Sequence, residues 1–167
     1  MAAPDDPHLI QVETHFQKMA RRSGGISRQQ ALENAQVAID SIKLGFSDWL
    51  DGEIQSLTAA ITKGKSAAAG SIDWAESAVA HARQIRDVGT TMGYDLATFI
   101  AGNLCEICES IVAGAPPRID LIDCHIGALA LAKQPQYRHL RPDQVPELST
   151  GLRRIVDVAG GSDEPGK

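Results

Sequence analysis

The chain has 167 residues, of which 43% are hydrophobic and only 4% aromatic, and its formal net charge is −5. This length and composition predict one soluble domain with an aliphatic core. The acidic balance and the lack of lysine- and arginine-rich runs argue against a nucleic-acid or anionic-membrane partner. Because no stretch approaches about 18 consecutive apolar residues, we expect no membrane helix.

The start of the chain and its cysteines bear on the cellular compartment. The first residues, MAAPDDPHL, contain two aspartates and no apolar run, which is unlike a secretory signal. The cysteine count is three, an odd number, and Cys105 and Cys108 lie in one predicted helix, so we expect no disulfide framework. These features predict a reducing compartment, most simply the bacterial cytoplasm.

Residues 1–25 are predicted to form an N-terminal arm. A short helix from Pro7 to Arg22 spaces four apolar residues for docking on a neighbour: Leu9, Val12, Phe16 and Met19. Ser23-Gly24-Gly25 would end this helix. We expect a helical bundle domain over residues 26–160 and a disordered tail over residues 161–167.

A long amphipathic helix from Ser27 to Lys63 organises the predicted bundle. Its apolar residues alternate steps of three and four, first as Leu32, Ala35, Ile39, Ile42, Phe46 and Trp49, then one position later as Leu50, Ile54, Leu57 and Ile61. Small residues at every seventh position form a second stripe: Ala31, Ala38, Gly45, Gly52 and Ala59. A glycine costs a helix about 1 kcal/mol relative to alanine, so we expect this stripe to admit a closely packed helix.

The ends of this helix and the next element follow from local signals. Ser27 and Gln30 have the spacing of a capping box, and Gly64 would stop the helix. After a short loop, a second helical stretch runs from Ser71 to Val112, again with small residues seven apart. Two such helices joined by a short loop predict an antiparallel hairpin. The segment Gly89-Thr-Thr-Met-Gly93 is expected to kink or break the second helix.

The last two predicted helices complete the fold. The stretch from Arg118 to Lys133 is apolar on nearly every side and is expected to be the most buried helix. A final helix would open at Pro142 and keep Pro146 in its first turn. Its inner face would consist of Val145, Leu148, Leu152, Ile155 and Val156. No strand pattern is present, so the predicted fold is all-α: an antiparallel helical bundle built on a long helical hairpin, with additional packed helices.

Two cysteines three residues apart, Cys105 and Cys108, would share one helix face, and Cys124 and His125 could complete a four-ligand zinc site. However, adjacent residues diverge by about 100° on a helix, which makes that coordination awkward. Free cysteine is also common in protein cores. We therefore predict that these thiols pack in the core, without a metal or cofactor, and keep a cysteine-based metal or redox sensor as an alternative.

The sequence contains two histidines of interest for phosphoryl chemistry, His125 and His81. Histidine phosphotransfer domains are helical bundles of similar size that carry the motif His-x-x-Lys-Gly. After His125, the corresponding positions hold Ala128 and Leu129, which removes the cation and fills the space. His81 has Gln84 at the third position and is predicted to be a solvated histidine on a polar face.

The candidate partner-binding residues are Asp120, Asp123 and His125. They lie within two turns of an otherwise apolar helix, where polar groups must be satisfied or used. His125 would either be a structural histidine bonded to a neighbouring helix or face a partner as a switchable group. No catalytic residue is predicted, because no nucleophile has an evident base and orienting group.

A longer pattern runs from Gly89-x-x-x-Gly93 through Leu96 and Asn103-Leu104-Cys105 to Asp123-Cys124-His125-Ile126-Gly127-Ala128-Leu129. Over residues 75–133 it resembles small helical proteins of alphaproteobacteria, among them chemotaxis-associated proteins of the CheE type. Those proteins have a glycine-flanked helical turn, a leucine-cysteine helix and a helix of the form His-x-x-Ala-Leu. The resemblance implies a cytoplasmic accessory protein of signalling that contacts a receiver domain or kinase, without known catalysis.

The favoured interpretation is therefore a non-enzymatic interaction module of bacterial signal transduction that binds a response-regulator receiver or a kinase. The long hairpin would also suit a homodimer. One alternative is a histidine phosphotransfer protein using His125 or His81. The exposure of His125 is the observation that best separates these interpretations.

Overall fold

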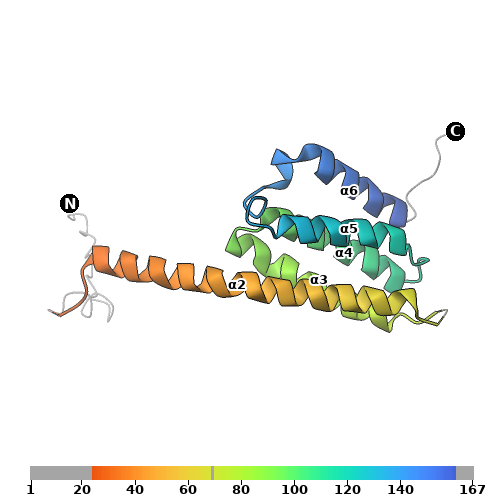
Figure 1. The fold of residues 1–167 in the computed structure, drawn as a ribbon, viewed down its shortest axis with the longest axis horizontal. Coiled ribbons are helices and arrows are strands. Elements are labelled where there is room, and N and C mark those ends of the chain that lie inside the picture. The colour runs from red at the N-terminus through yellow and green to blue at the C-terminus, as the bar shows by residue number, and fades with distance from the viewer. Residues whose placement is uncertain (1–23, 69, 161–167) are drawn as a thin grey trace, which may run out of the picture. The chain divides into compact units, whose positions relative to one another are not determined.

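The computed structural model describes residues 24–68 and 70–160. In this part of the chain the helices are α2 (Arg28–Lys65), α3 (Asp73–Gly89), α4 (Asp95–Val112), α5 (Ile119–Ala132) and α6 (Pro146–Ala159) (Figure 1). Two short 3-10 helices, η1 (Thr90–Met92) and η2 (Pro142–Gln144), join them, and no strand occurs among the described residues. The predicted all-α fold is thus confirmed. The helix expected from Pro7 to Arg22 and the tail 161–167 lie outside the described residues.

The chain falls into two units, residues 1–40 and residues 41–167. Within the described residues, the first unit contains the beginning of α2, and the second contains the remainder of α2 and all the other helices. The division of the chain at residue 25, expected from the sequence, stays a prediction.

The ends of α2 agree only partly with the sequence signals. At the start, the backbone N–H of Gln30 donates to Ser27 Oγ at 3.1 Å, which is the expected helix cap. At the other end, Gly64 does not stop the helix, which continues to Lys65. A Cβ at Gly64 would lie 2.5 Å from the indole of Trp74. Glycine is therefore needed here for the close approach of that ring, and the prediction of a glycine stop was wrong.

Within the second unit, α2 and α3 form an antiparallel hairpin. Gly64, near the end of α2, lies against Trp74 in the first turn of α3, whereas Glu53, earlier in α2, pairs with His81, later in α3. The α2 residues that are buried here share one face: Phe46, Leu50, Ile54, Leu57, Ala60 and Ile61. Except for Ala60, they belong to the apolar stripe that the sequence predicts, and they join the core formed by the other helices. The prediction is confirmed only from Phe46 onward, because the earlier members of that stripe are exposed: Leu32, Ala35, Ile39 and Ile42.

The stripe of small residues in α2 does not have the expected role. Gly45 and Gly52 are exposed, and a Cβ at either position would have no atom within 4 Å. The prediction that this stripe admits a closely packed helix was therefore wrong. The small residues of α3 behave in the opposite way, because Ala75 and Ala82 are fully buried and Gly89 leaves room for the side chain of Thr98 in α4.

The stretch from Ser71 to Val112 is two helices rather than one kinked helix. Gly93, with φ of 82°, adopts a left-handed backbone conformation that favours glycine, and the backbone N–H of Tyr94 donates to Gly89 O at 2.9 Å. The chain then reverses, so that α4 packs antiparallel to α3 and Arg83 reaches Glu109 at 2.6 Å. Of the two sequence-based alternatives, a kink or a break, the break is observed.

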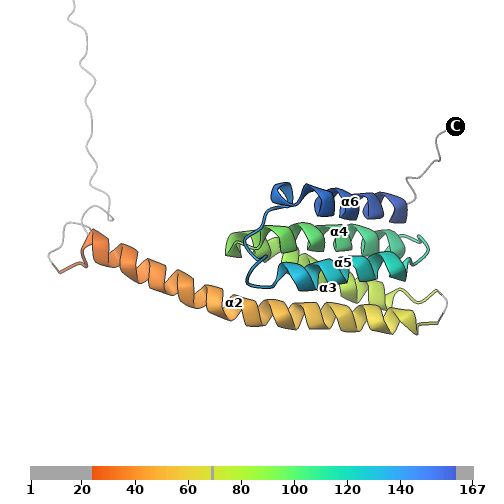
Figure 2. The same cartoon turned by 45° about the horizontal axis from the view of Figure 1, so that its top comes forward.

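The most buried helix is α4, not α5. Helix α4 contacts α3, α5 and α6, and Figures 1 and 2 show it lying among them. In α5 only one stripe is buried, consisting of Ile122, His125, Leu129 and Ala132. The opposite side exposes Cys124, Gly127 and Leu131. The α5 sequence is apolar on nearly all sides, which predicted the most buried helix. However, exposing small residues such as glycine and alanine to solvent costs little free energy, so one side of α5 can face solvent.

The last helix begins later than expected. Pro142 opens η2, and α6 starts at Pro146, the first helical position, where a missing N–H is tolerated. Leu152 and Val156 are buried, as the predicted inner face requires. The remaining members of that face are half-buried: Val145, Leu148 and Ile155.

Candidate functional site

His125 is enclosed within the bundle, with no exposed surface. Its Nδ1 lies 3.0 Å from the backbone carbonyl of Leu121, one turn earlier in α5, so we assign the ring proton to Nδ1. Nε2 has no hydrogen-bond partner of acceptable geometry. Burial lowers the pKa of His125, and the carbonyl groups of Leu121 and Leu152 oppose that shift only in part. Nδ1 is bonded within α5, and the carbonyl group of Leu152, in the neighbouring helix α6, also acts on the ring.

The three predicted partner-binding residues do not form one surface. Asp120 is exposed and receives two hydrogen bonds from Arg118, which lower the pKa of its carboxyl group. Asp123 is exposed and pairs with Lys65 of α2 at 2.8 Å. Because His125 is buried, the structure does not support it as a partner contact. A role for Asp120 and Asp123 in binding stays a prediction.

The cysteines are divided between the core and the surface. Cys105 and Cys108 are buried in α4, whereas Cys124 is exposed on α5. Burial raises the pKa of Cys105 to about 11 and that of Cys108 to about 12. Both thiols are therefore protonated at neutral pH and poorly suited to nucleophilic or metal chemistry. Among the described residues, no three histidine, cysteine or acidic side chains gather as a metal site would require.

His81 is not the solvated histidine that the sequence suggests. Its Nδ1 lies 2.8 Å from Oε2 of Glu53, across the α2–α3 hairpin. The His81 side chain is 28% exposed and that of Glu53 is 16% exposed. With its amide oriented to satisfy both groups, Gln84 donates to the two oxygens of Glu53 at 3.1 and 3.3 Å. The spacing of His81 and Gln84 places them on one helix face, but nothing local to the sequence identifies Glu53 as their partner.

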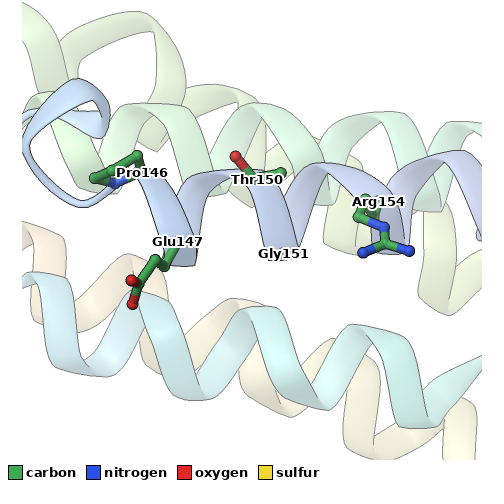
Figure 3. Close-up of a pocket in the computed structure, with 5 residues that line it drawn as sticks. All are labelled: Pro146, Glu147, Thr150, Gly151 and Arg154. Atoms are coloured by element: carbon green, nitrogen blue, oxygen red, sulfur yellow. The ribbon is translucent and has the colours of Figure 1, made fainter.

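A shallow depression on α6 is lined by residues of that helix alone (Figure 3). The lining consists of Pro146, Glu147, Thr150, Gly151 and Arg154. Figure 3 shows Glu147 and Arg154 at opposite ends of the depression, with Gly151 between them. Ligand sites are usually concave and place several polar groups toward one centre. This depression lacks that arrangement and does not indicate a small-molecule site.

The α2 residues of the first unit carry apolar side chains that are largely exposed. Leu32 is 61% exposed and Ile39 is 47% exposed. Together with the exposed Ala35, they share one helix face, and we call these three residues the apolar α2 surface. Val37 is 69% exposed but lies about 140° around the helix from Leu32.

Polar side chains lie along one side of the apolar α2 surface and bond to one another. The amide of Gln29 donates to Glu33 at 3.1 Å, and that of Gln36 donates to Asp40 at 2.9 Å. These hydrogen bonds are thus supplied within α2. The apolar strip therefore has a polar edge on that side of the helix.

Comparisons of the chain with models of known protein families, with curated proteins and with solved structures find no match. Within the residues that the structure describes, no helix combines the length and apolarity needed to cross a membrane.

Proposed function

We propose that this chain is a non-enzymatic helical interaction module of bacterial signal transduction, acting in the cytoplasm. Its partner in this proposal is a response-regulator receiver domain or a kinase, bound through the apolar α2 surface. The observation that carries the proposal is the exposure of Leu32 and Ile39 on one helix face. Contiguous exposed apolar side chains on a helix commonly mark a place where another protein binds.

The composition of the apolar α2 surface supports binding to another protein, through a helix or a groove of that partner. Its apolar side chains lie next to a polar edge formed on one side by Gln29, Glu33, Gln36 and Asp40. Protein interfaces typically combine apolar contacts with polar groups at their edges. The choice of a receiver or kinase comes from the resemblance to chemotaxis-associated proteins over residues 75–133.

The burial of His125 bears on the alternative of phosphotransfer at that residue. A phosphoryl donor must reach a ring nitrogen, and in this structure neither nitrogen of His125 is open to solvent. Phosphotransfer through His125 would require α5 to separate from the bundle. Contact without transfer needs no such rearrangement.

The proposal is tested by titrating purified receiver and kinase domains from the source organism against the full chain, with calorimetry as the readout. We expect Leu32→Asp and Ile39→Asp to weaken binding by more than tenfold, because each puts a charge in the apolar centre. Val37→Asp is the matched control, since Val37 is at least as exposed on the same helix but faces elsewhere. Circular dichroism checks that each variant keeps its helices.

Three results would contradict this assignment. An equal loss of affinity in Val37→Asp would indicate a general effect of the added charge on the helix. Unchanged affinity in Ile39→Asp would exclude the apolar α2 surface as the binding site. If only the double variant Asp120→Asn with Asp123→Asn loses binding, and the α2 variants keep it, the binding site lies on α5 instead. Sedimentation of the same variants reports whether the surface instead pairs two copies of this chain.

A further inference from the structure

We propose that His81 is a phosphoryl-acceptor site, whose Nε2 takes a phosphoryl group from an acyl phosphate. This inference goes beyond the contact function proposed above and does not depend on it. It is based on the pair formed by His81 and Glu53 and on the contrast with the other described histidines.

The carboxylate of Glu53 determines which nitrogen of His81 can react. A carboxylate accepts hydrogen bonds but cannot donate them, so the 2.8 Å contact places the ring proton on Nδ1. In the neutral form of the ring, the lone pair is then on Nε2. A carboxylate in this position both holds the ring and stabilises positive charge that develops on it.

The surroundings of the pair keep this arrangement fixed. With its amide oriented to satisfy both groups, Gln84 donates to both carboxylate oxygens of Glu53, so the carboxylate is held from a second direction. Glu53 is the more buried partner, and the ring of His81 is partly exposed. Nε2 of His81 is not among the buried side-chain atoms without a partner in the described residues. With 28% of its side chain exposed, the ring can be reached from solvent, while Glu53 is more fully covered.

The other described histidines lack this combination. In His125 the ring proton is bonded to a backbone carbonyl and Nε2 is buried. In His139, which is exposed, Nε2 accepts a hydrogen bond from Nε of Arg138 at 3.0 Å. Among the histidines that the structure describes, His81 is the one that combines a carboxylate partner with a partly exposed ring.

The reaction balances without a further reagent. The Nε2 lone pair attacks phosphorus, the N–P bond forms, and the bond from phosphorus to the acyl oxygen breaks. The electron pair of that bond leaves with the acyl group as a carboxylate. The imidazole keeps its Nδ1 proton and becomes positively charged, and Glu53 neutralises this charge. Gln84 and Ile85 stand where phosphotransfer domains have lysine and glycine, so we expect acceptance to be slow.

The test uses the full chain with acetyl phosphate as the probe. Phosphorus NMR at neutral pH identifies phosphohistidine, and mass spectrometry without acid treatment locates it. We expect His81 to be modified, and we expect His81→Asn to lose this signal. His139→Asn is the matched control and should be labelled as the parent is.

The role of Glu53 as a positioning residue is tested by rates. Glu53→Gln should slow labelling at His81 at least about tenfold, because the amide no longer stabilises the charged ring. Glu53→Asp should recover part of the rate, whereas a purely structural pair would leave the rate unchanged in both variants. The melting temperature of each variant is measured beside its rate.

Several outcomes would overturn the proposal. One is the absence of phosphohistidine at an acetyl phosphate concentration that modifies free imidazole. Another is equal labelling of His139 and His81, which would reflect exposure alone. The modified histidine is mapped first in the parent protein. That measurement tests the proposal even if His81→Asn does not fold.

Discussion

Two parts of α2 carry the same apolar spacing and have opposite environments. In the first unit, Leu32 is 61% exposed and Ile39 is 47% exposed, whereas in the second unit Leu50 is 1% exposed and Leu57 is fully buried. Each pair is seven residues apart, as one face of a helix requires. Apolar periodicity therefore specifies which helix face is suited to packing. It does not specify whether other helices of the chain bury that face.

Side-chain truncation should give the largest difference between the two environments. Leu104 of α4 is fully buried, so Leu104→Ala should lower the free energy of unfolding by about 2–5 kcal/mol through lost contacts and a cavity. Leu32→Ala should change it by less than about 0.5 kcal/mol. Urea denaturation at two protein concentrations measures both. A loss above about 1 kcal/mol in Leu32→Ala would show that Leu32 is covered in solution.

Glycines of α2 provide a second comparison, of smaller expected size. Gly64→Ala should lower the unfolding free energy by about 1–3 kcal/mol, because its methyl group meets the buried ring of Trp74. Gly52→Ala has open space and should raise stability by up to about 1 kcal/mol through helix propensity. Thermal unfolding of the two variants distinguishes the cases. A destabilised Gly52→Ala would mean that another helix packs on that position.

The burial of His125 predicts a pH dependence that the exposed part of α2 cannot have. Since its pKa is lowered in the folded state, the unfolded chain binds a proton first as the pH falls below the ordinary value of 6.5. The contribution of His125 to the free energy of unfolding is therefore fully present above pH 6.5. Below that pH it decreases by at most about 1.4 kcal/mol per pH unit. His125→Leu should reduce this slope in urea titrations from pH 7 to pH 5. An unchanged slope would mean that other groups cause it.

Ion pairs on the surface of the second unit should contribute least. Lys65 and Asp123 are 46% and 49% exposed, so water and salt screen the pair. Asp123→Asn should lower the unfolding free energy by less than about 1 kcal/mol, and the effect should disappear in about 1 M salt, where the Debye length is about 3 Å. Denaturation at low and high salt measures the difference. A larger effect that persists in salt would assign Asp123 a role beyond this pair.

The sequence alone determined the features that depend on neighbours along the chain. The cap at Ser27, the apolar spacing of α2 and the glycine-bounded interruption before α4 are local, because helix geometry relates residues three and four apart. The same local rules gave the all-α fold. They also placed Leu32 and Ile39 on one helix face, but that face was predicted to pack within the bundle, and the structure exposes it.

Tertiary structure decided the features that depend on residues far apart in the chain. Small residues seven apart are exposed in α2 and buried in α3, because burial depends on which helices pack against each face. Packing also enclosed His125 and decided that the predicted kink or break before α4 is a break with chain reversal. The pairing of His81 with Glu53 joins two helices, because only folding brings this carboxylate to one nitrogen of the ring and leaves the ring partly exposed.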